Sequence, residues 1–140
     1  MSFSPNVSPL FAAMAETGSV LVVEDEDYVA DLMLLVLSRG GVPCVRARDG
    51  AEALQLAAGN GGGGISLAMV DLCLPDIVGD ELCRQLRMLH PGLPVLLTSG
   101  RDLARFQGEL ARGGPTTLLS KPYRPAELLR QVRAMLPVAA

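Results

Sequence analysis

The sequence contains no tryptophan, one histidine and three cysteines, and this scarcity limits the metal sites that it can build. The cysteines, Cys44, Cys73 and Cys83, include no CxxC pair, and with a single histidine they cannot complete an ordinary zinc cage. An odd number of cysteines also argues against a disulfide framework. Free thiols are typical of the reducing cytoplasm, where we expect the protein to reside.

Long apolar runs and an excess of one charge are also missing. Apolar residues form 49% of the 140 residues, too many for a disordered tail and enough for the core of one domain. No run approaches the roughly 20 apolar residues of a membrane-spanning helix, and the N-terminus lacks the features of an export signal. The net charge of -3, from 12 basic and 15 acidic residues, includes no basic stripe. We therefore expect neither a membrane nor a nucleic acid as partner.

After Gly18 the chain alternates regularly between apolar runs and helical patterns. Residues 1–18 lack this periodicity, so we expect an arm or linker there, a single domain over residues 19–137 and a tail at 138–140. The apolar runs are short and nearly continuous, as in strands that are buried on both faces of a sheet. The expected strands are residues 19–23, 42–45, 65–70, 94–98 and 116–119.

A helical pattern follows each expected strand. Asp49 with Glu52 three residues later resembles a capping box, and Pro125 stands where proline is favoured in a first helical turn. This alternation predicts an α/β fold, a (βα)5 doubly wound parallel sheet. Pro43 removes a donor from the second strand, which therefore belongs at an edge. The helical patterns are Val29–Val36, the segment from Asp49 to Gly59, Leu82–Leu89, the weaker Leu103–Ala111, and the segment from Pro125 to Leu136.

Polar residues stand where the expected strands end. Glu24 and Asp25 follow the first strand and Asp71 the third, while Ser99 and Lys121 follow the fourth and fifth. Ligands of an open parallel sheet bind beyond the carboxyl ends of its strands, so we expect these side chains to share one rim. Carboxylates held together need a cation, and oxygen ligands suit Mg²⁺ or Mn²⁺. Asp71 is the natural nucleophile, because a carboxylate can form an aspartyl phosphate.

Five stretches, taken in order, resemble the receiver domains of two-component response regulators. The resemblance covers residues 19–137 and implies a five-stranded sheet with the flavodoxin-like order 2-1-3-4-5, which puts the second strand at an edge. The sequence Thr98-Ser99-Gly100 also resembles receivers that are attached to hybrid sensor kinases. The stretches that carry the resemblance are Val20–Glu26, Asp49–Leu54, Val70–Asp76, Pro94–Gly100 and Lys121–Tyr123.

The resemblance implies a role for each of the rim residues. Asp71 matches the phosphoacceptor, Ser99 the switch hydroxyl and Lys121 the phosphate-binding lysine. It also implies a cis bond between Lys121 and Pro122. Of the acidic pair, Asp25 matches the direct metal ligand, and the other carboxylate acts through water. The ligands of Mg²⁺ or Mn²⁺ that it implies are Glu24, Asp25, Asp71 and the backbone carbonyl of Cys73.

Four positions depart from the usual family pattern. Glu24 replaces a more usual aspartate, which moves that carboxylate outward by a methylene. Val78 and Arg124 stand where aspartates often cap helices, and the missing cap oxygen costs each helix roughly 0.5–2 kcal/mol. Leu118 stands where many receivers carry an aromatic switch residue. We therefore expect the loop after Ser99 and the helix 103–111 to carry the output signal.

The function that the resemblance implies is phosphorylation-dependent signalling. Asp71 would accept a phosphoryl group from a sensor histidine kinase or a histidine phosphotransfer protein, and the changed surface would be recognised by a downstream protein or by a second copy of the chain in a homodimer. Such a domain is a switch and not a metabolic enzyme, since it catalyses only its own phosphoryl transfer and dephosphorylation. His90 precedes a Pro-Gly pair, and we expect it to be solvated rather than to act as a phosphodonor.

Three other functions remain as alternatives. A phosphatase of the haloacid-dehalogenase kind would carry a second acid where Cys73 stands. A flavodoxin-type nucleotide binder would need a hydroxyl-rich loop in place of Glu24–Asp27, which repels phosphate. A receiver-like scaffold that has lost phosphorylation would not need the complete set of acids, hydroxyl and lysine.

Overall fold

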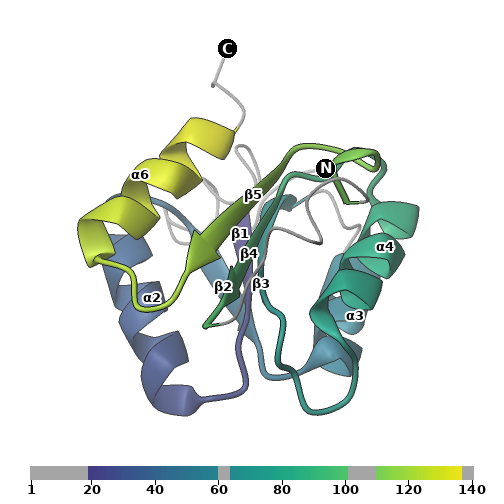
Figure 1. The fold of residues 1–140 in the computed structure, drawn as a ribbon, viewed down its shortest axis with the longest axis horizontal. Coiled ribbons are helices and arrows are strands. Elements are labelled where there is room, and N and C mark those ends of the chain that lie inside the picture. Colours follow the sequence, from purple (N-terminus) through teal and green to yellow (C-terminus); the bar gives the residue numbers. More distant parts are fainter. Residues whose placement is uncertain (1–18, 60–63, 101–109, 137–140) are drawn as a thin grey trace, which may run out of the picture.

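The computed structural model describes residues 19–59, 64–100 and 110–136, which form a five-stranded sheet between two layers of helices (Figure 1). The strand order is β2-β1-β3-β4-β5, and all four neighbouring pairs are parallel. The predicted fold class and strand order are therefore confirmed. The strands are β1 (Ser19–Val23), β2 (Cys44–Ala47), β3 (Ile65–Asp71), β4 (Val95–Ser99) and β5 (Thr116–Ser120).

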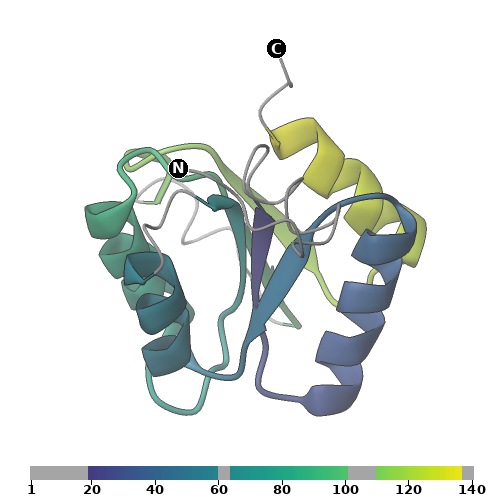
Figure 2. The same ribbon diagram turned by 180° about the vertical axis from the view of Figure 1, so that it is seen from behind.

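The helices cover both faces of the sheet. Helices α2 (Asp27–Arg39) and α6 (Pro125–Met135) lie on one face, and α3 (Gly50–Ala58) and α4 (Gly79–Leu89) on the other. Figure 2 shows the same two layers from behind. The predicted helix 103–111 lies outside the described residues apart from 110 and 111, which are helical. Within the described ranges, no helix combines the length and apolar character that crossing a bilayer requires.

Residues of the interior strand β1 point alternately into two separate cores. Val20 and Val22 pack on the side of α2 and α6, whereas Leu21 and Val23 pack on the side of α3 and α4. All four side chains are buried. A strand that is covered on both faces needs an apolar residue at every position, so its sequence shows a continuous apolar run instead of an alternation.

The second strand starts two residues later than predicted. The amide of Val42 donates to the carbonyl of Leu37 at 2.9 Å, which makes Val42 part of the turn that ends α2. Pro43 precedes the strand, and its carbonyl accepts from the amide of Val20 at 2.9 Å. The prediction that Pro43 lies within the strand is therefore wrong, but the edge position of β2 is confirmed. The other strand boundaries differ from the predicted ones by a residue at most.

The helix starts differ in how their amides are capped. At α3, the Asp49 carboxylate accepts from the amide of Glu52 at 2.9 Å, and the Glu52 carboxylate accepts from the amide of Arg48 at 3.0 Å. The predicted capping box thus forms, with its return bond one residue before the cap. The N-cap residues that make no side-chain cap bond are Glu26 of α2, Val78 of α4 and Arg124 of α6.

His90 is half-buried and joins two helices. Its Nε2 atom lies 2.9 Å from the carbonyl oxygen of Ala57, so the end of α4 is bonded to the end of α3. His90 is half-buried, so the prediction of a solvated histidine holds only in part, because the helix ends on this face come within reach of the ring. Cys44, Cys73 and Cys83 are free thiols, as predicted, and burial raises the pKa of Cys83 to about 12.

Candidate functional site

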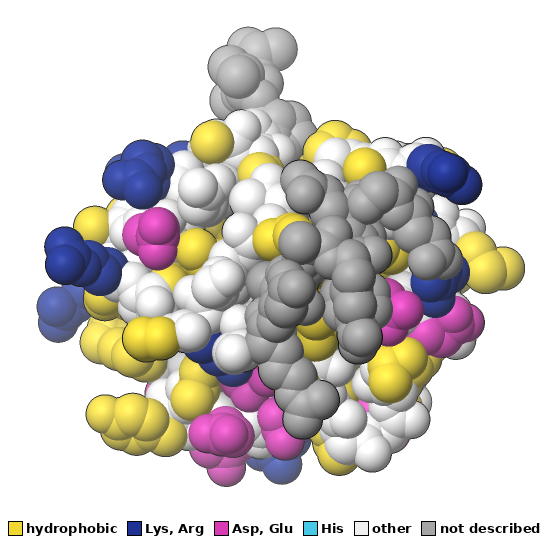
Figure 3. All heavy atoms as spheres, viewed as in Figure 1, with side chains coloured by type: hydrophobic (Ala, Val, Ile, Leu, Met, Phe, Trp, Pro, Cys, Tyr) yellow, Lys and Arg dark blue, Asp and Glu magenta, His cyan; other side chains and the backbone are white. Residues whose placement is uncertain are grey.

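Three carboxylates meet where β1 and β3 end. Glu24 and Asp25 follow β1 directly, and Asp71 is the last residue of its neighbour β3. One carboxylate oxygen from each residue lies within 4.8 Å of the others. Glu24 is 1% and Asp71 6% exposed, whereas Asp25 lies in contact with solvent. The carboxyl ends of the strands lie at the lower edge in Figure 1, and acidic side chains gather at this edge in Figure 3.

Lys121 faces the two buried carboxylates. Its Nζ atom lies 3.2 Å from Oδ2 of Asp71 and 3.4 Å from Oε1 of Glu24. The backbone amide of Lys121 donates to the carbonyl of Ser99 at 2.8 Å, which extends the pairing of β4 and β5 by a residue. This extension delivers the lysine to the end of the sheet. The structure therefore brings together the acids and the lysine that the sequence placed at one rim, and the Lys121–Pro122 bond is cis, as predicted.

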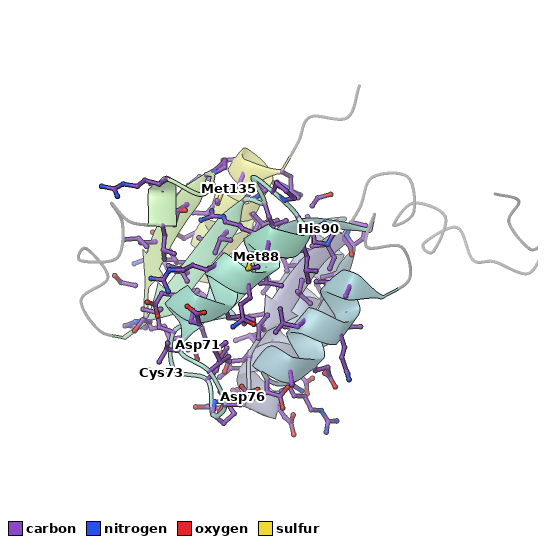
Figure 4. The ribbon with its side chains drawn as sticks, turned by 90° about the vertical axis from the view of Figure 1, so that its right-hand side faces the viewer. Asp71, Cys73, Asp76, Met88, His90 and Met135 are labelled. Atoms are coloured by element: carbon purple, nitrogen blue, oxygen red, sulfur yellow. The ribbon has the colours of Figure 1, made fainter. Side chains whose placement is uncertain are left out.

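The Asp71 carboxylate is oriented by the loop that follows it. The amide of Cys73 donates to Oδ1 of Asp71 at 3.1 Å, while Oδ2 faces Lys121. The amide of Gly79 donates to the carbonyl of Leu72 at 3.2 Å and closes the loop at its base. A Cβ atom on Gly79 would lie 2.7 Å from Cα of Leu72, so only glycine permits this approach. Figure 4 shows Asp71 and Cys73 at the same end of the molecule.

Burial and charge shift the titration of this cluster. Burial raises the pKa of Glu24 above its ordinary value, and the charge of Asp71 acts in the same direction against the opposing effects of Lys121 and of the amide of Glu26, 3.2 Å away. Burial alone would lower the pKa of Lys121, but the charges of Asp71 and Glu24 outweigh it and the pKa is raised. The ammonium group of Lys121 pairs with two of the three carboxylates, so the cluster carries excess negative charge.

The donor set suits a hard divalent cation. Carboxylate oxygens at this spacing are the ligands that Mg²⁺ and Mn²⁺ prefer, and a cation would relieve the repulsion among Glu24, Asp25 and Asp71. Cys73 lies two residues beyond Asp71 on the same loop, with an exposed side chain. That the backbone carbonyl of Cys73 is a further ligand of the cation stays a prediction.

Arg46 braces the acidic segment, and the sequence analysis missed it. Its Nε and Nη2 atoms donate to the backbone carbonyl of Glu24 at 3.1 and 2.8 Å, and its Nη1 atom lies 2.6 Å from Oδ1 of Asp27. These bonds fix the turn between β1 and α2, which carries Asp25. A lone arginine in an edge strand has no motif that could indicate this role. The only signal is its place in β2, opposite Val22.

Two adjacent hydroxyl residues end β4. Ser99 is buried, and its predicted role as the switch hydroxyl stays a prediction. Thr98 pairs in register with Asp71 and is equally buried. Among the buried side-chain nitrogen and oxygen atoms of the described residues, Oγ1 of Thr98 has no hydrogen-bond partner.

The predicted output route lies mostly outside the described residues, but Leu118 and Tyr123 are within them. Leu118 is half-buried and packs on the side of α3 and α4, while Tyr123 packs on the side of α2 and α6. Burial raises the pKa of Tyr123 to about 12. The expected transmission through helix 103–111 falls on residues outside the described ranges and stays a prediction.

Comparison with known families decides what this site belongs to. The sequence model of the response regulator receiver domain matches residues 20–133. The chain belongs to the response regulator receiver family. Receivers are domains of two-component signalling and act as switches, not as metabolic enzymes.

Curated relatives of this receiver include full-length regulators. The uncharacterized transcriptional regulatory protein YkoG of Bacillus subtilis is 35% identical over 121 residues, which cover 86% of this chain and 52% of the relative. The response regulator MprA of Mycobacterium sp. strain KMS is 36% identical over 117 residues, or 84% and 50% of the two chains. The receiver thus spans about half the length of these relatives.

Solved receivers share the fold. The chemotaxis protein CheY4 of Vibrio cholerae superposes with a TM-score of 0.76 at 25% identity, over 86% of this chain and 99% of CheY4. The receiver domain of NtrX from Brucella abortus gives a TM-score of 0.74 at 27% identity, over 84% and 98% of the two chains.

Proposed function

We propose that this receiver accepts a phosphoryl group on Asp71 from the phosphohistidine of a sensor kinase or of a phosphotransfer protein. The observation that carries the proposal is the position of the Asp71 carboxylate. It is buried, oriented by the amide of Cys73, paired with Lys121 and adjacent to Glu24 and Asp25. A carboxylate in this setting can act as a nucleophile toward phosphorus.

The transfer requires one bond to form and one to break. A carboxylate oxygen of Asp71 attacks the phosphorus atom, the P–N bond of the phosphohistidine breaks, and its electron pair returns to the imidazole. The amide of Cys73 holds the nucleophile in one orientation before the donor arrives. The ammonium of Lys121, 3.2 Å from Asp71, balances the charge that the phosphoryl group brings. Mg²⁺ or Mn²⁺ held by Glu24, Asp25, Asp71 and the Cys73 carbonyl would supply further positive charge to the phosphoryl oxygens.

Ser99 acts as the switch hydroxyl in this proposal. It ends β4 and lies one residue beyond Thr98, the partner of Asp71 in the sheet. A phosphoryl group on Asp71 attracts the hydroxyl, and the movement of Ser99 changes the segment after β4.

We take residues 19–137 as the receiver unit, residues 1–18 as an arm and 138–140 as a tail, in a cytoplasmic protein.

Helix α2 offers the phosphodonor a docking surface. Tyr28, Leu32 and Leu35 follow one another at helical spacing and are 83%, 48% and 48% exposed. Helix α2 begins two residues after Asp25, so this apolar stripe starts beside the acidic cluster. A donor protein that covers the stripe places its phosphohistidine near Asp71. Replacing Leu32 and Leu35 by serine should slow transfer from the protein donor and leave labelling by acetyl phosphate unchanged. Replacing Met88, an exposed apolar residue of α4, by serine is the control.

Mass spectrometry after treatment with acetyl phosphate and Mg²⁺ tests the acceptor assignment. The wild type should gain the mass of one phosphoryl group, and Asp71→Asn should gain none while it keeps the far-ultraviolet circular dichroism of the wild type. Phosphorylation of the variant would show that Asp71 is not the acceptor. A folded wild type that takes no phosphoryl group, from acetyl phosphate or from a kinase, would instead be a receiver-like scaffold.

A further inference from the structure

Helix α3 begins against a carboxylate from another part of the chain. The amides of Gly50 and Ala51 donate to Oδ1 and Oδ2 of Asp76 at 2.9 and 3.0 Å. The local cap, Asp49, satisfies the amide of Glu52. Asp76 therefore supplies the acceptors that the first two amides of the helix lack, and its negative charge lies at the positive end of the helix dipole.

The contact between the two segments is close on both sides of this carboxylate. A Cβ atom on Gly50 would lie 2.2 Å from Cγ2 of Ile77 and 3.3 Å from Oδ1 of Asp76. Glycine at the first position of α3 therefore allows the backbone of the helix to meet the loop directly. The Gly50–Ile77 packing and the two hydrogen bonds of Asp76 form one interface.

Asp76 and Ile77 belong to the loop 72–78, which connects the phosphoacceptor strand to α4. Near its base the loop is closed by the Gly79–Leu72 hydrogen bond and by the antiparallel bridge between Cys73 and Val78. Its tip is held by the interface with α3. Figure 4 shows Asp71, Cys73 and Asp76 in succession along this part of the molecule. The backbone that carries the Cys73 carbonyl is thus fixed between two anchors.

We propose that Asp76 is a positioning residue of the metal site. By docking the loop 72–78 on α3, it fixes the backbone of Cys73, whose carbonyl would be a further metal ligand in the proposed function, although Asp76 itself is not part of the acidic cluster. The inference rests on the proposed function, since it concerns the same site. Residues that orient metal ligands commonly change metal affinity by about 10–100-fold when they are replaced.

Thermodynamic linkage gives the proposal a second observable. If docking of the loop raises the affinity for Mg²⁺ by some factor, Mg²⁺ strengthens docking by the same factor. The amides of Gly50 and Ala51 are the donors in this contact, so their hydrogen exchange reports the docked state. A purely structural role in α3 predicts no response of these amides to Mg²⁺.

The test compares Asp76→Ala with Asp49→Ala in the full chain. Both variants remove a carboxylate cap from the same helix, but only Asp76 belongs to the loop. Calorimetric titration with Mg²⁺ should show an affinity about 10-fold lower for Asp76→Ala than for Asp49→Ala. In the wild type, Mg²⁺ should slow exchange at Gly50 and Ala51 by a similar factor. Asp76→Asn keeps one acceptor oxygen, should show a smaller loss, and serves where the alanine variant does not fold.

The outcomes separate this inference from the function beneath it. The positioning role would be overturned if the variants at Asp76 and Asp49 bound Mg²⁺ with equal affinity. It would also be overturned if Mg²⁺ left amide hydrogen exchange at Gly50 and Ala51 unchanged. Neither result would contradict phosphoryl uptake by the wild type. A wild type that neither binds Mg²⁺ nor takes up a phosphoryl group would overturn the proposed function, and the inference with it.

Discussion

Two cationic side chains lie at the two opposite edges of the sheet where its parallel strands begin and end. The charges of these side chains are compensated in different ways. Lys121 lies at the carboxyl edge between Asp71 and Glu24. Arg87 of α4 is buried at the other edge, where β4 and β5 begin. In the described structure its hydrogen-bond acceptors are uncharged: the carbonyls of Leu93 at 3.0 Å, Leu110 at 2.6 Å and Pro115 at 2.8 Å, and Oγ1 of Thr116 at 2.9 Å.

The difference separates a structural cation from one that is available for chemistry. The planar fork of Arg87 has its donors matched by fixed backbone dipoles, so the geometry at that edge is complete. Lys121 is a single ammonium opposite a larger number of carboxylates, so its edge keeps excess negative charge. The negative charge that the protein leaves unbalanced at this edge can be balanced by a bound cation.

The largest effect is expected at the structural edge. Arg87→Leu removes the donors to three backbone carbonyls and should lower the free energy of unfolding by about 3–5 kcal/mol, since a buried polar group without a partner costs about 1–3 kcal/mol. Denaturant unfolding measures this loss. Arg84→Leu on the same helix is the control, because its ion pairs with Asp80 and Glu81 are partly exposed and contribute about 1 kcal/mol or less. Equal losses in the free energy of unfolding for both variants would show that Arg87 is no more important for stability than a partly exposed arginine.

A smaller effect, and one that Mg²⁺ reverses, is expected at the carboxyl edge. Lys121→Met leaves Glu24 and Asp71 without their shared cation and should destabilise the metal-free protein by about 1–2 kcal/mol. Thermal melts with and without Mg²⁺ should show a larger metal-induced rise in Tm for the variant than for the wild type. The comparison of the two edges would fail if Mg²⁺ stabilised both proteins equally.

Thr98→Val should stabilise the protein slightly. The change replaces the Thr98 hydroxyl, which has no hydrogen-bond partner among the described residues, with a methyl group of similar size, which should add about 1 kcal/mol to the free energy of unfolding. Thr117→Val on the half-buried part of β5 is the matched control and should be near neutral. A loss of stability in Thr98→Val would indicate that the hydroxyl has a partner in solution.

The smallest effect concerns Asp76, the acidic counterpart of Arg87, whose charge is also matched by backbone groups. The hydrogen bond from the amide of Gly50 lowers the pKa of Asp76 below its ordinary value of 3.8. A lowered carboxyl pKa contributes stability above that value, and this contribution is lost as the pH falls through the folded-state pKa. The stability gap between the wild type and Asp76→Asn should therefore close between neutral pH and pH values below 3.8. A constant gap would argue against an ionised Asp76 in this contact.

The site could be located from the sequence because it is made of side chains at strand ends. Glu24, Asp71 and Lys121 were predicted to meet, since parallel strands bring their carboxyl ends to one edge, and the structure places them within contact distance. Arg87 and Asp76 could not be predicted in the same way. Their partners are backbone groups of distant segments, and a carbonyl or an amide has no signature in the sequence.

Strand boundaries were predictable only to within a few residues. The turn that ends α2 takes up Val42, because its amide is used by Leu37, and this shortens the second strand at its start. An apolar residue in such a turn looks like part of the strand that follows. The same limit explains His90, whose contact with Ala57 depends on how closely two helix ends approach.

The order of the strands has a consequence for biosynthesis. Glu24 and Lys121, which are in contact at the site, are separated by 97 positions in the chain. A ribosome releases the acidic residues of β1 long before it releases the lysine beyond β5, so the nascent chain carries its carboxylates without their cation. Translation must pass Lys121 before Glu24 and Asp71 have the cation that pairs with them in the folded domain.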